Sequence, residues 1–347
     1  MDQLTNNLRL LCNGCLQSNE MLMMFKESEI VCGYKILECL CKGGFSQIYK
    51  ASDPDGKPVI LKFPDLSLIS DPVTYERFRR EFAIGQKLNH PAIPKAINLV
   101  ESSDGLFLVL NYIEGKSLRA FISDNAPLHL NEALSIADQL VEAVDYLHAH
   151  GVCHRDLKPE NIIIGPDGRL HIIDFGSSLL EGSRRVTWRF GSDTFGTPDY
   201  MAPEQIQGKR GDVRTDVYAL GIILYELLTG TVPFHGDNAL SVMNQHLTAI
   251  PILPRQLQPS IPLEIEAIIL KSIRRNPDER YQFASELLND LKHFSDIDLS
   301  QFPKDPELKS TSVLTDRQIW IGTFLIFIAF LILTVLIVLV TYLKHRQ

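Results

Sequence analysis

The distribution of apolar residues divides the chain into a strand-like first part and a helical second part. Apolar runs of strand length lie at residues 34–40, 48–51, 58–63 and 106–112, and they are separated by turns such as Asp53-Pro54-Asp55-Gly56. Short runs bounded by Asp, Pro and Gly are typical of strands joined by hairpins. Residues 75–88 have helical spacing instead and predict one helix within this part.

Helical spacing dominates after residue 115. The segment 131–150 has one apolar face, and Asn131 is placed to cap this helix; the face consists of Ala133, Ile136, Ala137, Leu140, Val141, Val144 and Leu147. Helical patterns recur at 213–230 and 263–294. Because strands come first and helices follow, the order predicts an α+β fold with a β-rich N-lobe at 34–111 and an α-helical C-lobe at 112–295.

One long apolar run lies near the end of the chain. Residues 319–343 contain no charged side chain, and Trp320 and Tyr342 lie near the two ends of the run, where aromatic belts form. As a helix it would extend about 37 Å, more than the ~30 Å hydrocarbon core of a bilayer. The pattern predicts one C-terminal transmembrane helix between a polar juxtamembrane linker at 296–318 and a short tail at 344–347. A buried core helix is the weaker alternative, because such helices seldom need so long an apolar run.

Residues 1–33 predict a poorly specified leader without a secretory signal, because charged and polar residues interrupt its leucines. Translation starting at one of Met21, Met23 and Met24 is a second interpretation of this segment. Cys12 and Cys15 have the spacing of half a metal site or of a redox pair. No second Cys or His pair with zinc-like spacing follows, so ordinary thiols are favoured.

The bulk properties of the 347 residues agree with a large globular domain. The net charge of −8 gives no indication of nucleic-acid binding, which usually appears as a basic domain. The six cysteines are scattered along the chain, as is typical of proteins in a reducing compartment.

Three motifs carry the candidate chemistry. Residues 154–161 read HRDLKPEN, Asp174-Phe175-Gly176 follows after an apolar run, and residues 196–204 read GTPDYMAPE. The first two place two carboxylates, a lysine and an asparagine on neighbouring loops. Phosphoryl transfer from ATP requires such a set to deprotonate a hydroxyl, to hold magnesium and to neutralise the moving phosphoryl group. On these motifs the chain resembles the eukaryotic-like serine/threonine protein kinase family, in particular its bacterial membrane-anchored members.

The resemblance implies a bilobal protein kinase fold over 34–295, with ATP and Mg²⁺ as cofactors and Mn²⁺ as an alternative ion. It implies that Asp156 accepts the proton of the substrate hydroxyl and that Lys158 contacts the γ-phosphate. Asn161 and Asp174 would bind the metal. A lysine two residues after the catalytic Asp is the serine/threonine form of this loop.

The resemblance also assigns a nucleotide site. Lys62 would hold the α- and β-phosphates with Glu81 as its ion-pair partner, and Leu110 would take the gatekeeper position. Cys41 and Ser46 stand where the glycine-rich loop of the family has glycine. The expected ATP-binding residues are Leu40, Gly43, Gly44, Ser46, Ile48, Lys62, Glu81, Leu110 and Tyr112.

Between the second and third motifs lies the expected activation segment. Its hydroxyl residues alternate with arginines, and Arg155 precedes the catalytic Asp, so we expect autophosphorylation there to order the segment. A flexible polar loop is the alternative. The hydroxyl residues considered are Thr187, Ser192, Thr194 and Thr197. By resemblance, Glu204 would pair with Arg280, and Asp216 would support the backbone of the catalytic loop.

Together these expectations describe a membrane-tethered serine/threonine kinase that acts on proteins and faces the cytoplasm, where ATP is found. The localisation expected is a single-pass protein of a bacterial inner membrane, with no sensor domain beyond the span and no nucleic-acid partner. A homodimer would favour trans-autophosphorylation. One rival function is that of a nucleotide-binding pseudokinase that acts as a scaffold. Only the altered glycine-rich loop supports it. A second is a small-molecule phosphotransferase, which would be expected to lack the motif at 196–204.

Overall fold

The computed structural model describes residues 25–42, 46–65, 72–102, 105–180 and 198–301. The chain divides into two compact units, Met1–Pro306 and Glu307–Gln347, and all described residues belong to the first. Gly43, Gly44 and the activation-segment residues Thr187, Ser192, Thr194 and Thr197 lie outside the described residues, as do Cys12 and Cys15. Among the described residues no helix is long and apolar enough to cross a bilayer, and the expected span at 319–343 lies outside them.

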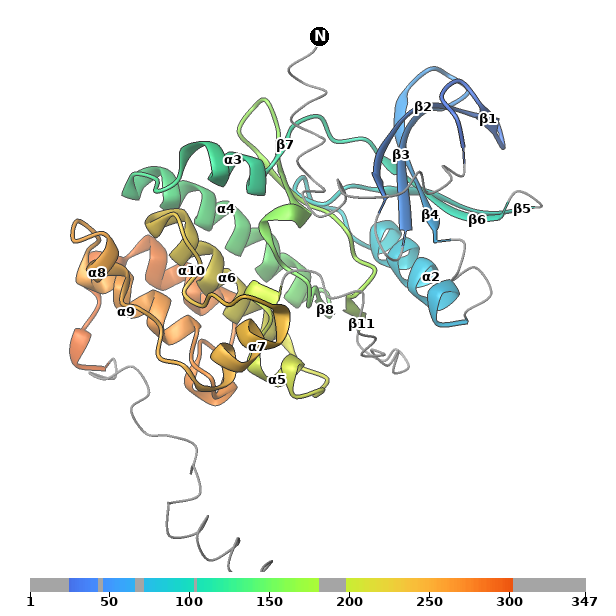
Figure 1. The fold of residues 1–347 in the computed structure, drawn as a ribbon. Helices are drawn as coiled ribbons and strands as arrows, with labels where there is room; N and C mark the ends of the chain where they lie inside the picture. Colours follow the sequence, from blue (N-terminus) through green and yellow to red (C-terminus); the bar gives the residue numbers. More distant parts are fainter. Residues whose placement is uncertain (1–24, 43–45, 66–71, 103–104, 181–197, 302–347) are drawn as a thin grey trace, which may run out of the picture. The chain divides into compact units, whose positions relative to one another are not determined.

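The N-lobe is built on a six-stranded sheet whose neighbouring strands are antiparallel, in the order β1-β2-β3-β4-β6-β5 (Figure 1). The strands are β1 (Ile30–Val31), β2 (Tyr34–Lys42), β3 (Ser46–Ser52), β4 (Pro58–Pro64), β5 (Ala96–Ser102) and β6 (Gly105–Asn111). The expected turn between β3 and β4 is present. The Asp53 side chain accepts hydrogen bonds from the backbone N–H groups of Asp55 and Lys57, and Gly56 has a φ of 81°. Such a turn needs a residue without a Cβ at this φ.

The two faces of this sheet are covered differently. Helix α2 (Pro72–Lys87) packs on one face, where Phe78 meets Ala96 and Leu108. A Cβ built on Gly85 would lie 2.6 Å from the Cβ of Ala96, so only glycine allows α2 to approach β5 this closely. The other face holds a separate cluster of buried side chains, with Tyr49, Phe63 and Phe107 fully enclosed.

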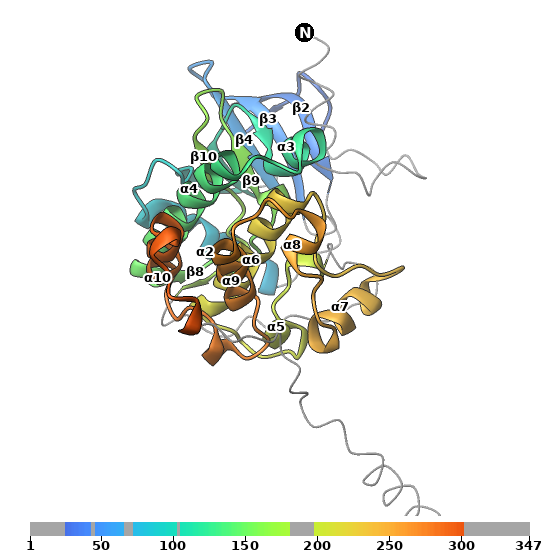
Figure 2. The same cartoon turned by 90° about the vertical axis from the view of Figure 1, so that its left-hand side faces the viewer.

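The C-lobe is a group of helices around α6 (Figure 2). Every residue of α6 from Thr215 to Thr229 is buried. The helix begins where the Asp212 side chain accepts a hydrogen bond from Arg214 N, and it ends at Gly230, which has a φ of 77°. The helices are α3 (Leu118–Asn125), α4 (Leu130–Ala149), α5 (Pro203–Ile206), α6 (Val213–Thr229), α7 (Ala239–Thr248), α8 (Pro254–Leu257), α9 (Leu263–Ser272) and α10 (Ala284–Lys292).

Two sequence expectations for these helices need adjustment. Asn131 is not the cap of α4, because the helix begins one residue earlier and His129 takes the N-cap position. The carbonyl of His129 accepts from the backbone N–H groups of Glu132 and Ala133, and no side chain caps the helix. The helical pattern at 263–294 corresponds to α9 and α10. Helix α9 already ends at Ser272, and a short 3-10 helix at Pro277–Glu279 precedes α10.

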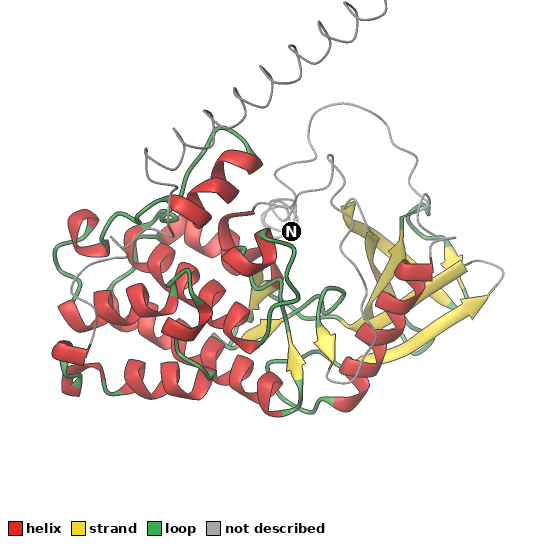
Figure 3. Cartoon of the chain, turned by 90° about the horizontal axis from the view of Figure 1, so that it is seen from below, coloured by secondary structure: helices red, strands yellow, loops and turns green. Residues whose placement is uncertain are grey.

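Short strands position the loops between the two lobes. Strands β9 (Ile162–Ile164) and β10 (Leu170–Ile172) form the expected hairpin, with Ile162 opposite Ile172, and β7 (Lys116–Ser117) pairs with β9. Strands β8 (Val152–Cys153) and β11 (Leu179–Leu180) form a second pair. Figure 3 shows the large sheet on one side and the helices on the other, with these short strands between them.

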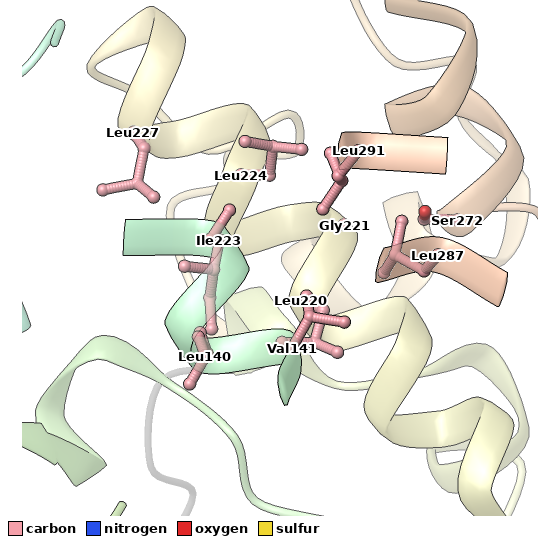
Figure 4. Close-up of a pocket in the computed structure, with 11 residues that line it drawn as sticks. Leu140, Val141, Leu220, Gly221, Ile223, Leu224, Leu227, Ser272, Leu287 and Leu291 are labelled. Carbon is pink, nitrogen blue, oxygen red and sulfur yellow. The ribbon is translucent and has the colours of Figure 1, made fainter. Parts of the chain in front are cut away.

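A small apolar cavity lies within the helical core, between α4, α6, α9 and α10 (Figure 4). The Ser272 hydroxyl at its wall donates to the carbonyl of Ile268, so its hydrogen-bonding capacity is used within the helix. An apolar cavity of this kind stays dry. Its walls are formed by Ala137, Leu140, Val141, Leu220, Gly221, Ile223, Leu224, Leu227, Ser272, Leu287 and Leu291.

Candidate active site

Three charged side chains from distant parts of the chain meet on the face of the six-stranded sheet that α2 covers. Lys62 on β4 places its Nζ 2.8 Å from an Oε atom of Glu81 on α2 and 2.8 Å from Oδ1 of Asp174, which follows β10. Only 6% of Lys62 and 2% of Glu81 are exposed to solvent. The pairing register of β4 and the packing of α2 therefore determine where the Lys62 side chain lies. The β9–β10 hairpin positions Asp174, the third charged residue.

Burial and charge oppose each other in this cluster. Burial favours the neutral form of Asp174, but the Lys62 ammonium outweighs it and holds the pKa of that carboxyl below its usual value. The two carboxylates in turn raise the pKa of Lys62 against the effect of burial. Burial raises the pKa of Glu81. With all three groups ionised, one ammonium faces two carboxylates, and the remaining negative charge suits a cation.

The catalytic loop holds Asp156, Lys158 and Asn161 together. Lys158 Nζ lies 3.1 Å from Oδ2 of Asp156. The Asn161 side-chain amide donates to the backbone carbonyl of Asp156 at 2.9 Å and to its Oδ2 at 3.1 Å. Burial opposes the charge of Lys158, but the Asp156 carboxylate raises its pKa above the usual value. Asn161 therefore fixes the aspartate through its amide nitrogen and keeps its own side-chain oxygen available for a metal.

Asp216 on α6 supports the backbone of this loop. Its Oδ2 accepts from the backbone N–H of His154 at 2.8 Å, and its Oδ1 accepts from that of Arg155 at 2.7 Å. His148 Nε2 lies 2.9 Å from Oδ2. Burial would raise the pKa of Asp216, yet these hydrogen bonds lower it. The support is needed because Arg155 has a φ of 67°, a left-handed conformation that a non-glycine residue adopts at a cost.

The loop that carries Asp174 is held in a similar way. Asp174 has a φ of 66°, and its Oδ1 accepts from Gly176 N at 3.1 Å. The ring of Phe175 contacts that of His154 edge-on, with 5.1 Å between the centroids. This contact links the loop that carries Asp174 to the loop that carries Asp156.

Glu204 and Arg280 form a buried bidentate ion pair in the C-lobe. Both terminal nitrogens of Arg280 donate to the Glu204 carboxylate, at 2.9 and 2.8 Å. The guanidinium also donates to the backbone carbonyls of Arg214, Arg274 and Arg275. The pair therefore ties α5 to the chain before α10, as a structural support rather than a reacting group.

The expected adenine-side residues lie where the lobes join. Leu40 and Ile48 lie at the ends of β2 and β3 that lead into the glycine-rich loop, and Ser46 begins β3. Leu110 is on β6 opposite Ile60, and Tyr112 follows directly after that strand. Lys50 Nζ lies 4.4 Å above the Tyr112 ring, a cation–π contact that helps to hold the joining segment.

Sequence reasoning missed an arginine that connects three segments near the catalytic loop. Arg119 on α3 donates to Glu160 at 2.8 Å and to Glu226 on α6 at 2.6 Å, and it also donates to the Tyr200 hydroxyl. Asp199 lies near the same acidic group: burial, and next the Glu226 carboxylate, raise the pKa of Asp199 to about 6. A single arginine early in a short helix gives no sequence signal for these long-range contacts. His148 was missed for the same reason.

A group of arginines gathers around Arg155, and one of them contacts the last residues described before the expected activation segment. Burial, against the pull of nearby acidic groups, lowers the pKa of Arg155, and the guanidinium groups of Arg210 and Arg80 lower it further. Arg80 donates to the carbonyl of Ser178, two residues before the segment leaves the described part of the chain. Arg155 Nε is buried and has no hydrogen-bond acceptor among the described residues. Such a concentration of positive charge favours an anion.

The donor chemistry of the site fits a hard divalent cation. Asp174 offers a carboxylate and Asn161 an amide oxygen, which are the oxygen ligands that Mg²⁺ prefers. A second cluster, of His148, Cys153 and Asp216, fits a metal poorly. Burial raises the pKa of the Cys153 thiol, and the Asp216 oxygens are occupied by backbone N–H groups.

Comparison with known proteins places these features in a family. A family profile described as protein kinase domain matches residues 34–291. The serine/threonine-protein kinase PrkC of Bacillus subtilis is 36% identical over 266 residues, which cover 76% of this chain and 41% of PrkC. The serine/threonine-protein kinases PknB of Mycolicibacterium smegmatis and Mycobacterium tuberculosis are 35% and 34% identical over 292 residues, 82% of this chain and 45% of each relative. The chain thus spans less than half the length of these curated relatives.

Proposed function

We propose that this chain, which belongs to the protein kinase domain family, transfers the γ-phosphate of ATP to serine and threonine hydroxyls of proteins. The observation that carries the proposal is the convergence of Lys62, Glu81 and Asp174 in one ion-pair cluster, with Asp156 and Asn161 on a neighbouring loop. These residues come from both lobes and from four separate segments. Structural ion pairs alone would not require all of them.

Each residue has a role that follows from its contacts. The Lys62 ammonium, held by Glu81, would bind the α- and β-phosphates. The Asp156 carboxylate would orient the substrate hydroxyl and take its proton as the oxygen bonds to the γ-phosphorus and the bond to ADP breaks. Lys158 would then balance the charge on the transferred group. Asn161 and Asp174 would hold Mg²⁺, with Mn²⁺ as an alternative; when bound, the ion would neutralise charge on the phosphate oxygens.

The test is transfer of labelled phosphate from ATP to a generic basic protein, followed by phosphoamino-acid analysis. We expect label on serine and threonine with the wild-type chain and little transfer with Asp156→Asn. Equal transfer by the two proteins, or label on tyrosine alone, would overturn the proposal. ATP binding without transfer by the wild type would instead support a scaffolding pseudokinase.

We further propose that the activation segment is autophosphorylated on one of Thr187, Ser192 and Thr194. The support is the arginine group of Arg80, Arg155 and Arg210, which would pair with the phosphate. Phosphopeptide mapping of wild type and of Asp156→Asn tests this. Phosphate within 181–197 is expected in the wild type alone, and unmodified peptides in both samples would refute it.

We also propose that residues 319–343 anchor the chain in a membrane with the kinase domain on the cytoplasmic side. The support is the uncharged apolar run itself. Two anchored chains would meet often enough to phosphorylate each other in trans. Removing 319–347 should preserve activity on an added substrate but slow autophosphorylation in vesicles. Equal rates for the two forms would refute the anchoring argument.

A further inference from the structure

We propose that Phe25, which precedes the matched family domain, is a positioning residue for the glycine-rich hairpin formed by β2 and β3 and so for ATP binding. The inference rests on the proposed function. The matched domain begins at residue 34, whereas the part of the chain that the structure describes begins at Phe25. The segment between them is therefore an addition whose contacts need an explanation of their own.

Phe25 completes the aromatic cluster on the sheet face opposite α2. Its ring lies 4.8 Å from the ring of Phe63 and 5.9 Å from that of Tyr49, measured between centroids. Phe63 in turn lies 4.7 Å from Phe107. The three partner rings are fully buried, while Phe25 is partly buried and covers them from outside. Edge-on and tilted contacts at these distances are stabilising aromatic geometries.

A hydrogen bond continues from this cluster to the base of the hairpin. The Tyr49 hydroxyl donates to Oε1 of Gln47 at 2.7 Å, and both side chains are buried. The backbone N–H of Phe25 donates to the same hydroxyl at 3.4 Å. Gln47 is paired with Lys42, the last residue pair before the loop at 43–45. A change at Phe25 therefore reaches the hairpin through a single intermediate side chain.

The backbone fixes Phe25 in place. Ser28 N donates to the Ile36 carbonyl at 2.9 Å, and Ile36 N donates to the Glu29 carbonyl at 2.8 Å. The turn is closed by the Glu29 side chain, which accepts from Lys26 N at 2.9 Å. The segment is thus bonded along β2, the strand that leads into the glycine-rich loop. These hydrogen bonds hold the segment from Lys26 to Glu29 against β2.

The expected consequence is specific to nucleotide affinity. The glycine-rich hairpin would cover the ATP phosphates, so loosening its base should weaken binding of MgATP. Asp156 and Lys158 lie on the other lobe and keep their contacts, so the chemical step should continue at saturating ATP. The KM for ATP should rise while kcat changes little.

The experiment compares full-length variants by steady-state kinetics and by calorimetric binding of MgATP. Phe25→Ala should raise both KM and Kd about three- to tenfold, the factor that an aromatic pair of ordinary strength supplies. Phe25→Tyr keeps the ring and should restore wild-type values. Tyr49→Phe keeps the ring contacts but removes the hydroxyl, and it should raise the KM; the melting temperature should also fall, because the buried Gln47 side chain loses the donor at its Oε1. Ile30→Ala is the matched control, because this β1 side chain is 69% exposed.

The double variant Phe25→Ala/Tyr49→Phe tests whether Phe25 influences the hairpin through the Tyr49 hydroxyl. If Phe25 acts through the Tyr49 hydroxyl, the double variant should bind ATP about as weakly as the weaker of the two single variants. Independent, multiplying effects would overturn the proposed route. An unchanged KM in Phe25→Ala, with only a lower melting temperature, would reduce Phe25 to a stabilising contact and overturn the inference. A wild-type chain that transfers no phosphate would contradict the proposed function instead.

Discussion

Replacing Asp216 by asparagine should both destabilise the C-lobe and slow catalysis. The carboxylate accepts the backbone N–H groups of His154 and Arg155 and contacts His148, and it is fully buried. Asparagine retains one acceptor oxygen and has an NH₂ group in place of Oδ2. This NH₂ group faces the two groups that are hydrogen-bonded to Oδ2 in the wild type, His154 N and His148 Nε2. Two buried groups lose their acceptor, at about 1–3 kcal/mol each, so we expect a loss of roughly 2–6 kcal/mol in the free energy of unfolding.

Urea denaturation followed by circular dichroism measures this loss, with Asp212→Asn as the matched control. Asp212 caps the same helix, and asparagine caps helices as well as aspartate does, so the control should stay within about 1 kcal/mol of the wild type. Catalysis gives the second readout. Without Oδ2 the backbone of His154 loses its support, directly before the left-handed Arg155, and kcat should fall about tenfold or more where the variant is still folded. Wild-type stability together with wild-type kcat in Asp216→Asn would refute the reasoning.

The other predictions concern pH, packing and the ion pair. The pKa of Asp216 is lower in the folded chain than its usual value of 3.8, so its contribution to stability is present above that pH and is lost below it; Asp216→Asn should therefore flatten the acid side of a stability–pH curve. The pKa of Asp199 is raised to about 6, which disfavours the folded state increasingly as the pH rises from about 4 to 6; Asp199→Asn should raise the melting temperature more at pH 8 than at pH 5. Leu224→Ala would enlarge the cavity of Figure 4 and should cost about 2–5 kcal/mol in urea denaturation, whereas a cost under 1 kcal/mol would contradict the packing described. Lys62→Met should weaken MgATP binding measured by calorimetry, and unchanged affinity would remove Lys62 from the nucleotide site.

Local patterns allowed much of the fold and the site to be predicted. The turn at Asp53–Gly56, the apolar face of α4 and the β9–β10 hairpin each depend on residues close in sequence, so composition and spacing sufficed. The catalytic loop was also recognisable, because its reacting groups lie within eight consecutive residues. The α4 cap was wrong by two residues, because backbone carbonyls rather than a side chain form it.

Contacts between distant segments could not be predicted in the same way. Arg119 meets Glu226 across 107 positions of sequence, and nothing near either residue specifies the partner. Phe25 was assigned to a leader without defined structure, because a lone aromatic residue gives no periodic signal. Its role became visible only once β3 and β4 placed Tyr49 and Phe63 side by side. Pairings of this kind depend on the tertiary fold.

The central claim is that Asp156 serves as the proton acceptor in a site completed by Lys62 and Asp174. Single-turnover transfer of labelled γ-phosphate, with enzyme in excess and ATP saturating, isolates the chemical step. For Asp156→Asn we predict a transfer rate at least about 100-fold below the wild type, with MgATP affinity retained. A rate within a few-fold of the wild type would contradict the account.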